Sequence, residues 1–198
     1  YASLIQRAIL PDRQLSATLG EHHFILWKPR DVVGGDFYVY REQADGYLIG
    51  VVDCAGHGVP GALMTMLARA AIDHAIEAVG SRDPAAILGE TDQAMRSMLS
   101  QEQIPQALAT NMDAGLVWVD RRRRQLAFAG AKISLYASDG EEVQELKGAR
   151  RAIGDKRRGD YRNIEVPLAP GWTFYLSTDG FLDQAGGEHG FGFGSRRF

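Results

Sequence analysis

The sequence predicts an α+β fold in which antiparallel sheets are accompanied by helices. Two observations support this prediction. The pair Asp45-Gly46 is typical of a hairpin turn, and it would join Asp36-Arg41 to Tyr47-Asp53 as antiparallel neighbours. Further along, two helical segments are followed by short β-rich runs with brief turns between them, and strands joined in this way favour antiparallel sheets.

The chain begins with a predicted helix over residues 1–10. Its apolar residues recur on one helical face: Leu4, Ile5, Ala8 and Ile9. Pro11 must end this helix, because proline disfavours helical geometry in the residue before it. From Leu15 to Trp27 the pattern favours strands, and a loop then leads into the strand that begins at Asp36.

Two consecutive helices are predicted in the middle of the chain. Their apolar residues lie at helical spacing, at Leu63, Leu67, Ala71 and Ile72 in the first helix and at Ile87, Leu88, Met95 and Leu99 in the second. Asp83-Pro84 supplies an N-cap and a first-turn proline for the second helix. The β-rich runs that follow lie near Ala109-Val119, Gln125-Ala129, Ile133-Ala137, Val143-Leu146, Tyr161-Val166 and Trp172-Ser177.

The composition fits one domain with a single sizeable core, since 45% of the 198 residues are hydrophobic. A formal net charge of -3 gives no overall electrostatic reason to bind nucleic acid or an anionic membrane. The one strongly basic run, 121–124, is interpreted as an exposed hairpin turn. A single cysteine, Cys54, excludes a disulfide within the chain and fits a reducing compartment. Without an apolar stretch of about 20 residues, we expect a soluble, cytoplasmic domain.

A carboxylate at the end of a buried strand is the central feature of the sequence. The apolar run from Tyr47 to Val52 leads directly to Asp53, and a glycine-rich turn follows before the helix that begins near Ala62. The glycines allow backbone angles that side chains would forbid, so carbonyl or amide groups of this turn can approach a metal ion or a phosphate closely.

Three aspartates, Asp36, Asp53 and Asp179, each lie beside a glycine at a strand boundary. A single pair of this kind usually marks only a turn. Together they suggest a site, because carboxylates at the edge of a core are costly unless they are paired or coordinated. Clustered carboxylates favour hard cations such as Mg²⁺ or Mn²⁺ over zinc. His57 is interpreted as a structural residue of the turn.

The residues around these aspartates resemble the three metal-site motifs of metal-dependent serine/threonine protein phosphatases, the PPM family. The motifs are Gly34-Gly35-Asp36-Phe37-Tyr38, Val52-Asp53-Cys54-Ala55-Gly56-His57-Gly58-Val59-Pro60 and Ser177-Thr178-Asp179-Gly180. More narrowly, they are similar to the bacterial SpoIIE and RsbU branch. Supporting matches lie at Ile5-Gln6 with Leu10-Pro11, at Asn111-Met112-Asp113-Ala114 and at Ala129-Gly130-Ala131.

The resemblance implies an α-β-β-α sandwich of two antiparallel sheets flanked by helices, with a two-metal site at one edge. Asp53 would bridge two divalent cations, either Mn²⁺ or Mg²⁺, and Asp36 would hold one of them. The backbone carbonyl of Cys54 would be a further ligand, and Asp179 would hold the second ion. Asp36 and Asp53 would be the catalytic residues, and no substrate-binding residue is assigned.

The resemblance also implies an activity and partners. A hydroxide bridging the two ions would hydrolyse phosphoserine or phosphothreonine on a small regulatory protein of the anti-sigma-factor-antagonist type. An upstream sensor or membrane-anchored module of the parent protein would control the domain through the helix over residues 1–10, which is also a possible homodimer contact. No nucleic acid partner is expected.

The chain departs from the family pattern near its end. Relatives in this branch close the metal site with an Asp-Asp pair in a last strand, and no such pair follows Asp179. We therefore expect residues 1–198 to be a single phosphatase domain that is truncated at its C-terminus.

Two alternatives remain open. A catalytically weak pseudophosphatase could act as a binding module. A dinucleotide-binding domain is suggested by Gly56-His57-Gly58-Val59-Pro60-Gly61, which fits the Gly-x-Gly-x-x-Gly pattern between a strand and a helix.

Overall fold

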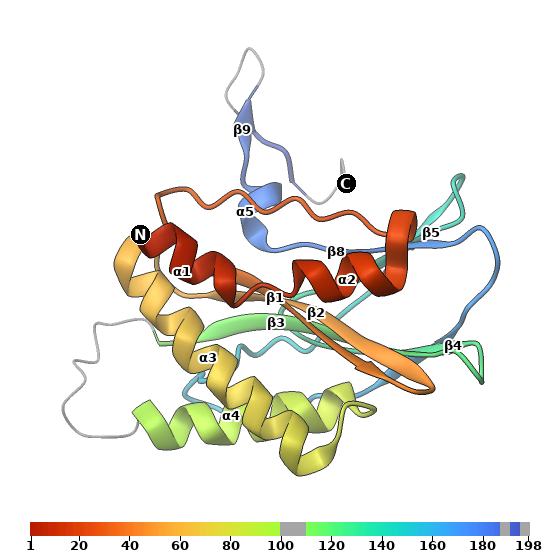
Figure 1. The fold of residues 1–198 in the computed structure, drawn as a ribbon, viewed down its shortest axis with the longest axis horizontal. Coiled ribbons are helices and arrows are strands. Elements are labelled where there is room, and N and C mark those ends of the chain that lie inside the picture. The colour runs from red at the N-terminus through yellow and green to blue at the C-terminus, as the bar shows by residue number, and fades with distance from the viewer. Residues whose placement is uncertain (100–109, 187–190, 195–198) are drawn as a thin grey trace.

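The structure is a computed structural model that describes residues 1–99, 110–186 and 191–194 (Figure 1). The strands are β1 (Asp36–Gln43), β2 (Gly46–Cys54), β3 (Met112–Asp120), β4 (Gln125–Ala131), β5 (Leu135–Ser138), β6 (Val143–Leu146), β7 (Ile164–Pro167), β8 (Thr173–Leu176), β9 (Ala185–Gly186) and β10 (Phe191–Gly192). The helices are α1 (Ala2–Ala8), α2 (Asp12–Leu19), the short 3₁₀ helix η1 (Gly20–His22), α3 (Gly58–Val79), α4 (Pro84–Leu99) and α5 (Asp179–Leu182).

Two antiparallel sheets form the centre of the molecule. The larger has the strand order β1-β2-β3-β4-β7 and the smaller the order β6-β5-β8, while β9 and β10 pair separately. All pairings between these named strands are antiparallel. The predicted α+β class is therefore confirmed. The dinucleotide-binding alternative is wrong, because that fold is built on a parallel sheet.

The predicted hairpin between β1 and β2 is present. Asp36 pairs with Asp53 and Arg41 with Leu48, and the strands continue to Gln43 and from Gly46 around the turn. On the other side of β2, β3 runs antiparallel with Asp53 opposite Asp113. The ends of three neighbouring strands thus meet at one edge of the larger sheet.

The two faces of the larger sheet are covered differently (Figure 1). On one face, α3 and α4 pack against side chains such as Leu48 and Val52 in a continuous buried cluster. The opposite face is shared: α2 covers Tyr38 and Tyr40 with the fully buried Leu15, and the smaller sheet packs over β3 and β4. One layer holds α3 and α4, the next is the large sheet, and α2 and the small sheet cover its other face.

The segment from Leu15 to Trp27 does not form the strands that its pattern favours. It forms most of α2 and then η1, and the residues after His22 have no regular structure. Burial explains the difference, because Leu15 of α2 is 0% exposed, whereas Phe24 and Leu26 are 72% and 63% exposed. Tertiary packing of one leucine outweighs the local strand preference.

The other predicted elements are found with small shifts of their ends. The N-terminal helix covers Ala2–Ala8, and the two middle helices are α3 and α4. The side chain of Asp83 caps α4, since its Oδ1 accepts the N–H of Ala86 at 3.0 Å. The β-rich runs correspond to β3 through β8, although Ala109 lies outside the described residues.

The basic run at 121–124 is the expected turn, which joins β3 to β4. Asp120 Oδ1 accepts the N–H groups of Arg122 at 3.0 Å and Arg123 at 2.8 Å, which fixes the turn and leaves the arginines in solvent. No helix in the described part of the chain has the length and apolar character needed to cross a membrane.

Candidate active site

Three carboxylates lie in a row across the larger sheet. Asp36 on β1 is opposite Asp53 on β2, and Asp53 is opposite Asp113 on β3. Directly paired residues of neighbouring strands project to the same face of a sheet. This is the face turned toward α2 and the smaller sheet, because Cys54, one position on, joins the cluster under α3 and α4. The register alone therefore concentrates negative charge at this edge.

A fourth carboxylate comes from the segment that follows β8 of the smaller sheet. Thr178 follows β8, and its Oγ1 donates a hydrogen bond to Oδ2 of Asp36 over 3.1 Å, across 142 positions of sequence. Asp179, the first residue of α5, is close enough for its charge to raise the pKa of Asp36, Asp53 and Asp113. The predicted site residues Asp36, Asp53 and Asp179 are thus brought together from the larger sheet and α5.

The turn after Asp53 is packed tightly against the loop before Asp36. The N–H of Cys54 donates to the carbonyl of Gly35 over 3.1 Å. A Cβ atom at Gly35 would collide with the carbonyl oxygen of Cys54 and would lie 2.8 Å from that of Gly56. Only glycine permits this approach, which brings backbone carbonyl oxygens next to the acidic row.

The side chain of Cys54 faces away from the site. It is 1% exposed and belongs to the hydrophobic cluster beneath α3 and α4. Burial raises the pKa of its thiol above the ordinary value, and the neighbouring charge of Asp53 adds to the effect. A thiol in this state is poorly nucleophilic. Only the backbone carbonyl of Cys54 is placed near the carboxylates.

Burial and mutual repulsion make this carboxylate row unfavourable when ionised. Desolvation raises the pKa of Asp36 from its ordinary value, and the charge of Asp179 adds to it. The same causes, with the charge of Asp36, raise the pKa of Asp53 to about 8. Desolvation also raises the pKa of Asp113. The charge of Lys132, whose Nζ lies 3.3 Å from Oδ2 of Asp113, lowers that pKa and partly offsets the effect. Such a row favours bound cations.

The raised pKa values predict a pH dependence of the metal-free protein. Asp53 has an ordinary pKa of 3.8 and a folded-state pKa of about 8, so the folded protein holds more protons than the unfolded chain between these values. The free energy of unfolding should therefore be greatest near pH 3.8 and should fall as the pH rises from there to about 8. We expect the midpoint of thermal unfolding to fall by several degrees from pH 5.5 to pH 8 in the presence of a chelator.

The control for this measurement is the Asp53→Asn variant, which lacks the titrating group and should lose less stability over the same pH range. Saturating Mn²⁺ should also reduce the fall in the original protein, because bound cations favour the ionised carboxylates. An equal pH dependence in both proteins would contradict the assignment of the effect to Asp53.

Asp113 was not singled out by the sequence analysis, although it lies within a segment that matches the family. Its position opposite Asp53 depends on the pairing of β2 with β3, which are separated by two helices. His57, in the turn after Asp53, has its Nδ1 2.8 Å from Oδ2 of Asp31, and both side chains are well exposed.

The donors present fit hard cations. Within the described ranges, no three His, Cys, Asp or Glu side chains form a ready-made metal-binding cluster. The available donors are instead the carboxylates of the larger sheet, that of Asp179 in α5 and the carbonyl of Cys54, and all of these donate through oxygen. Mg²⁺ and Mn²⁺ prefer oxygen ligands, and Mg²⁺ commonly keeps several of its water molecules when it is held by one or two carboxylates. An open, partly hydrated centre suits this arrangement.

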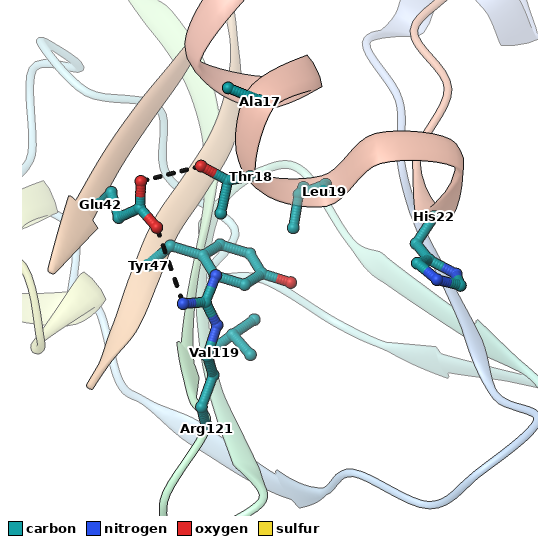
Figure 2. Close-up of a pocket in the computed structure, with 8 residues that line it drawn as sticks. All are labelled: Ala17, Thr18, Leu19, His22, Glu42, Tyr47, Val119 and Arg121. Carbon is teal, nitrogen blue, oxygen red and sulfur yellow. Dashed lines mark hydrogen bonds and ion pairs between the residues drawn. The ribbon is translucent and has the colours of Figure 1, made fainter. Parts of the chain in front are cut away.

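A separate cavity of about 640 Å³ lies away from the acidic row (Figure 2). The guanidinium carbon of Arg121 lies 5.3 Å from the centroid of the Tyr47 ring. Nη1 of Arg121 lies 3.7 Å from Oε1 of Glu42, and Oε2 of Glu42 accepts a hydrogen bond from Oγ1 of Thr18 over 2.8 Å. Glu42 is near the hairpin end of β1 and Asp36 is at the other end. At about 3.3 Å per residue, about 20 Å of strand separates them. The cavity therefore does not belong to the carboxylate site.

The two packed antiparallel sheets, the helices and the acidic edge define the fold class of PP2C-type phosphatase domains. The sequence model of the family described as Stage II sporulation protein E (SpoIIE) matches residues 43–197. The chain belongs to this family, and the predicted membership in the SpoIIE/RsbU branch of PPM-type phosphatases is confirmed.

Solved structures agree with this assignment. The SiaA-PP2C domain of Pseudomonas aeruginosa is 95% identical, with a TM-score of 0.94, and the match covers 100% of this chain and 77% of that one. RsbX in complex with magnesium is 19% identical with a TM-score of 0.60 over 80% of this chain and 72% of that one. The PP2C domain of SpoIIE from Bacillus subtilis is 18% identical, with a TM-score of 0.58 over 76% and 43% of the two chains. A comparison with curated protein sequences finds no match.

Proposed function

We propose that this domain is a metal-dependent protein serine/threonine phosphatase with its active centre at Asp36, Asp53 and Asp179. The observation that carries the proposal is the convergence of Asp36 and Asp53 of the larger sheet with Asp179 of α5 at one edge of the sandwich. Burying like charges together is unfavourable without a cation. Family membership supports the same chemistry, and so does a fold shared with RsbX, which is solved in complex with magnesium.

In this proposal each donor has a distinct place. Asp53 is at the centre of the row and would bridge two ions, Asp36 and the carbonyl of Cys54 would hold one of them, and Asp179 the other. Two divalent cations held there would neutralise the phosphate monoester and would lower the pKa of bound water, which would supply a nucleophile near neutral pH. Thr178 would keep Asp36 in orientation through its hydrogen bond to Oδ2.

We further propose a substrate and a setting for the domain. The substrate would be a phosphoserine or phosphothreonine on a regulatory protein of the anti-sigma-factor-antagonist type, a class consistent with the resemblance to the RsbU branch. The fold is shared with a solved structure of the RsbU and RsbW domains of Rv1364c from Mycobacterium tuberculosis, 18% identical with a TM-score of 0.61 over 80% of this chain and 43% of that one. Residues 1–198 would be one catalytic domain, controlled from an upstream sensor module and able to dimerise through α1.

The test is hydrolysis of a phosphoserine peptide by the purified domain, with Mn²⁺, with Mg²⁺ and with a chelator. A second chain extended past Phe198 is assayed in parallel, because no acidic pair of the family pattern occurs between Asp179 and Phe198. We expect metal-dependent phosphate release that increases in the longer chain. If both proteins are folded and bind Mn²⁺ in calorimetry but neither releases phosphate, the domain is a binding module and not an enzyme.

Replacing Cys54 by serine should leave the catalytic rate within about threefold of the original, since only the carbonyl of this residue would bind metal. Stability should fall, because a hydroxyl group replaces the thiol in an apolar cluster. The measurements are kcat with a phosphoserine peptide at saturating Mn²⁺ and the thermal unfolding midpoint. A variant that is folded, binds Mn²⁺ normally and is inactive would show that the thiol takes part in the reaction.

A further inference from the structure

We propose that Gln6 of α1 is a positioning residue that holds the loop carrying Asp36, and that Trp27 completes this support. The inference rests on the proposed metal-dependent function and adds to it the residues that fix one ligand in place. It follows from two sets of contacts that join α1 to the backbone at Gly34, two positions before Asp36, and, through Trp27, at Asp36 itself.

The first set is a pair of hydrogen bonds between Gln6 and Gly34. The side-chain Nε2 of Gln6 donates to the carbonyl of Gly34 over 2.6 Å, and the N–H of Gly34 donates to Oε1 of Gln6 over 3.0 Å. Gln6 is only 1% exposed, and Gly34 is also buried. Both backbone groups of Gly34 therefore depend on one side chain, because water does not reach them.

The second set reaches Asp36 from the other side. The indole N–H of Trp27 donates to the backbone carbonyl of Asp36 over 2.9 Å. The guanidinium carbon of Arg7 lies 5.7 Å from the centroid of the Trp27 ring, within the range of a cation–π interaction. Two adjacent residues of α1, Gln6 and Arg7, thus support the chain two positions before Asp36 and at Asp36 itself.

The burial pattern of α1 indicates that these polar contacts determine where it sits. Gln6 is the one buried residue of this helix, all of which is described, whereas Leu4 and Ile5 are 68% and 62% exposed. A helix held mainly by an apolar face would bury the leucine and isoleucine instead. Burying an amide is unfavourable unless both of its ends are hydrogen-bonded, so the position of α1 is tied to that of Gly34.

The loop transmits this constraint to the acidic row. Gly34 is followed by Gly35, which packs against the carbonyl oxygens of Cys54 and Gly56, and then by Asp36. A shift of Gly34 would therefore change the distance between the Asp36 carboxylate and the Cys54 carbonyl, the two groups proposed to hold the same ion. Losing a hydrogen bond that orients a metal ligand typically weakens metal binding by about 10- to 100-fold.

The test compares Mn²⁺ binding by the metal-free domain and two variants, using titration calorimetry with Mn²⁺ alone. Gln6→Met keeps the length of the side chain and removes both hydrogen bonds. Gln14→Met makes the same exchange at an exposed site on α2 and is the matched control. We expect Gln6→Met to raise the dissociation constant of Mn²⁺ about 10- to 100-fold, and Gln14→Met to leave it unchanged.

Kinetics on a phosphoserine peptide give a second readout. Gln6→Met should need a higher Mn²⁺ concentration for half-maximal rate, while kcat at saturating Mn²⁺ and KM for the peptide stay within about threefold of the original. If Gln6→Met does not fold, Trp27→Phe replaces it, since that variant keeps an aromatic ring for Arg7 and removes only the donor to Asp36. A rise in its Mn²⁺ dissociation constant supports the proposal.

The outcomes separate the two proposals. Unchanged Mn²⁺ affinity in a folded Gln6→Met or Trp27→Phe variant overturns the positioning role, while hydrolysis by the unsubstituted domain leaves the proposed function intact. An equal loss in Gln14→Met also overturns it. If the unsubstituted domain neither binds Mn²⁺ nor releases phosphate, the proposed function fails and the positioning role with it.

Discussion

Replacing Asp53 by asparagine is expected to lower metal-dependent hydrolysis of a phosphoserine peptide by about a thousandfold or more. Asp53 is the central carboxylate of the row, with Asp36 opposite it on β1 and Asp113 opposite it on β3. It is therefore the residue best placed to bridge two ions. The measurement is the initial rate at saturating Mn²⁺, together with Mn²⁺ affinity from calorimetry.

The loss of activity should not come from unfolding. Burial and like charges raise the pKa of Asp53, so a neutral amide removes an unfavourable interaction from the metal-free protein. We expect the thermal midpoint of Asp53→Asn at pH 8, without metal, to equal or exceed that of the original. Asp160→Asn is the control, because Asp160 is 75% exposed and pairs only with Arg162 among the ion pairs of the described chain. Near-normal activity in Asp53→Asn would remove the basis of the proposed function.

Gly35→Ala is expected to reduce activity severely and to destabilise the domain by about 1–3 kcal/mol. The added Cβ would collide with the carbonyl oxygen of Cys54 and crowd that of Gly56, and both neighbours are backbone atoms that cannot rotate away. The strand end must move, and the Cys54 carbonyl moves with it. Urea unfolding and Mn²⁺-dependent rates measure the two effects.

Gly89→Ala is the matched control for this substitution. A Cβ at Gly89 meets nothing within 4 Å, and the residue lies inside α4, where alanine favours the helix by up to about 1 kcal/mol. The control should be active and equally or more stable. If Gly35→Ala were as stable and active as Gly89→Ala, the close packing of the two loops would not be required for the site.

Local sequence signals were sufficient to predict the two strands that carry Asp36 and Asp53. The Asp45-Gly46 pair predicted the hairpin, and in the structure Gln43 pairs with Gly46 around the turn, which sets Asp36 opposite Asp53. The predictions of α3, α4 and the later strands also depended on periodicity and turn residues, which act over a few positions. These signals were sufficient to predict the α+β class and to place two of the proposed ligands at the same end of one hairpin.

Several features that depend on distant contacts were not predicted, and the meeting of Asp179 with Asp36 and Asp53 was expected from the family resemblance and not from local signals. The segment from Leu15 is helical because Leu15 is buried against Tyr38 and Tyr40, partners that a local pattern does not contain. Asp113 joins the acidic row only through the register of β3 with β2. The contact of Gln6 with Gly34 spans 28 positions, and a single glutamine in an apolar helical pattern gives no sign of it.

The separation in sequence between the two sides of the active centre has a consequence for the order of folding. Asp36 and Asp53 meet as soon as a hairpin with a short turn closes, whereas Thr178 contacts Asp36 across 142 positions. Closing the longer loop costs more chain entropy, and contacts of this range form slowly. A newly made chain would therefore hold two repelling carboxylates before Asp179 arrives, and a divalent cation captured by that early pair would favour the hairpin on which the rest of the sheet assembles.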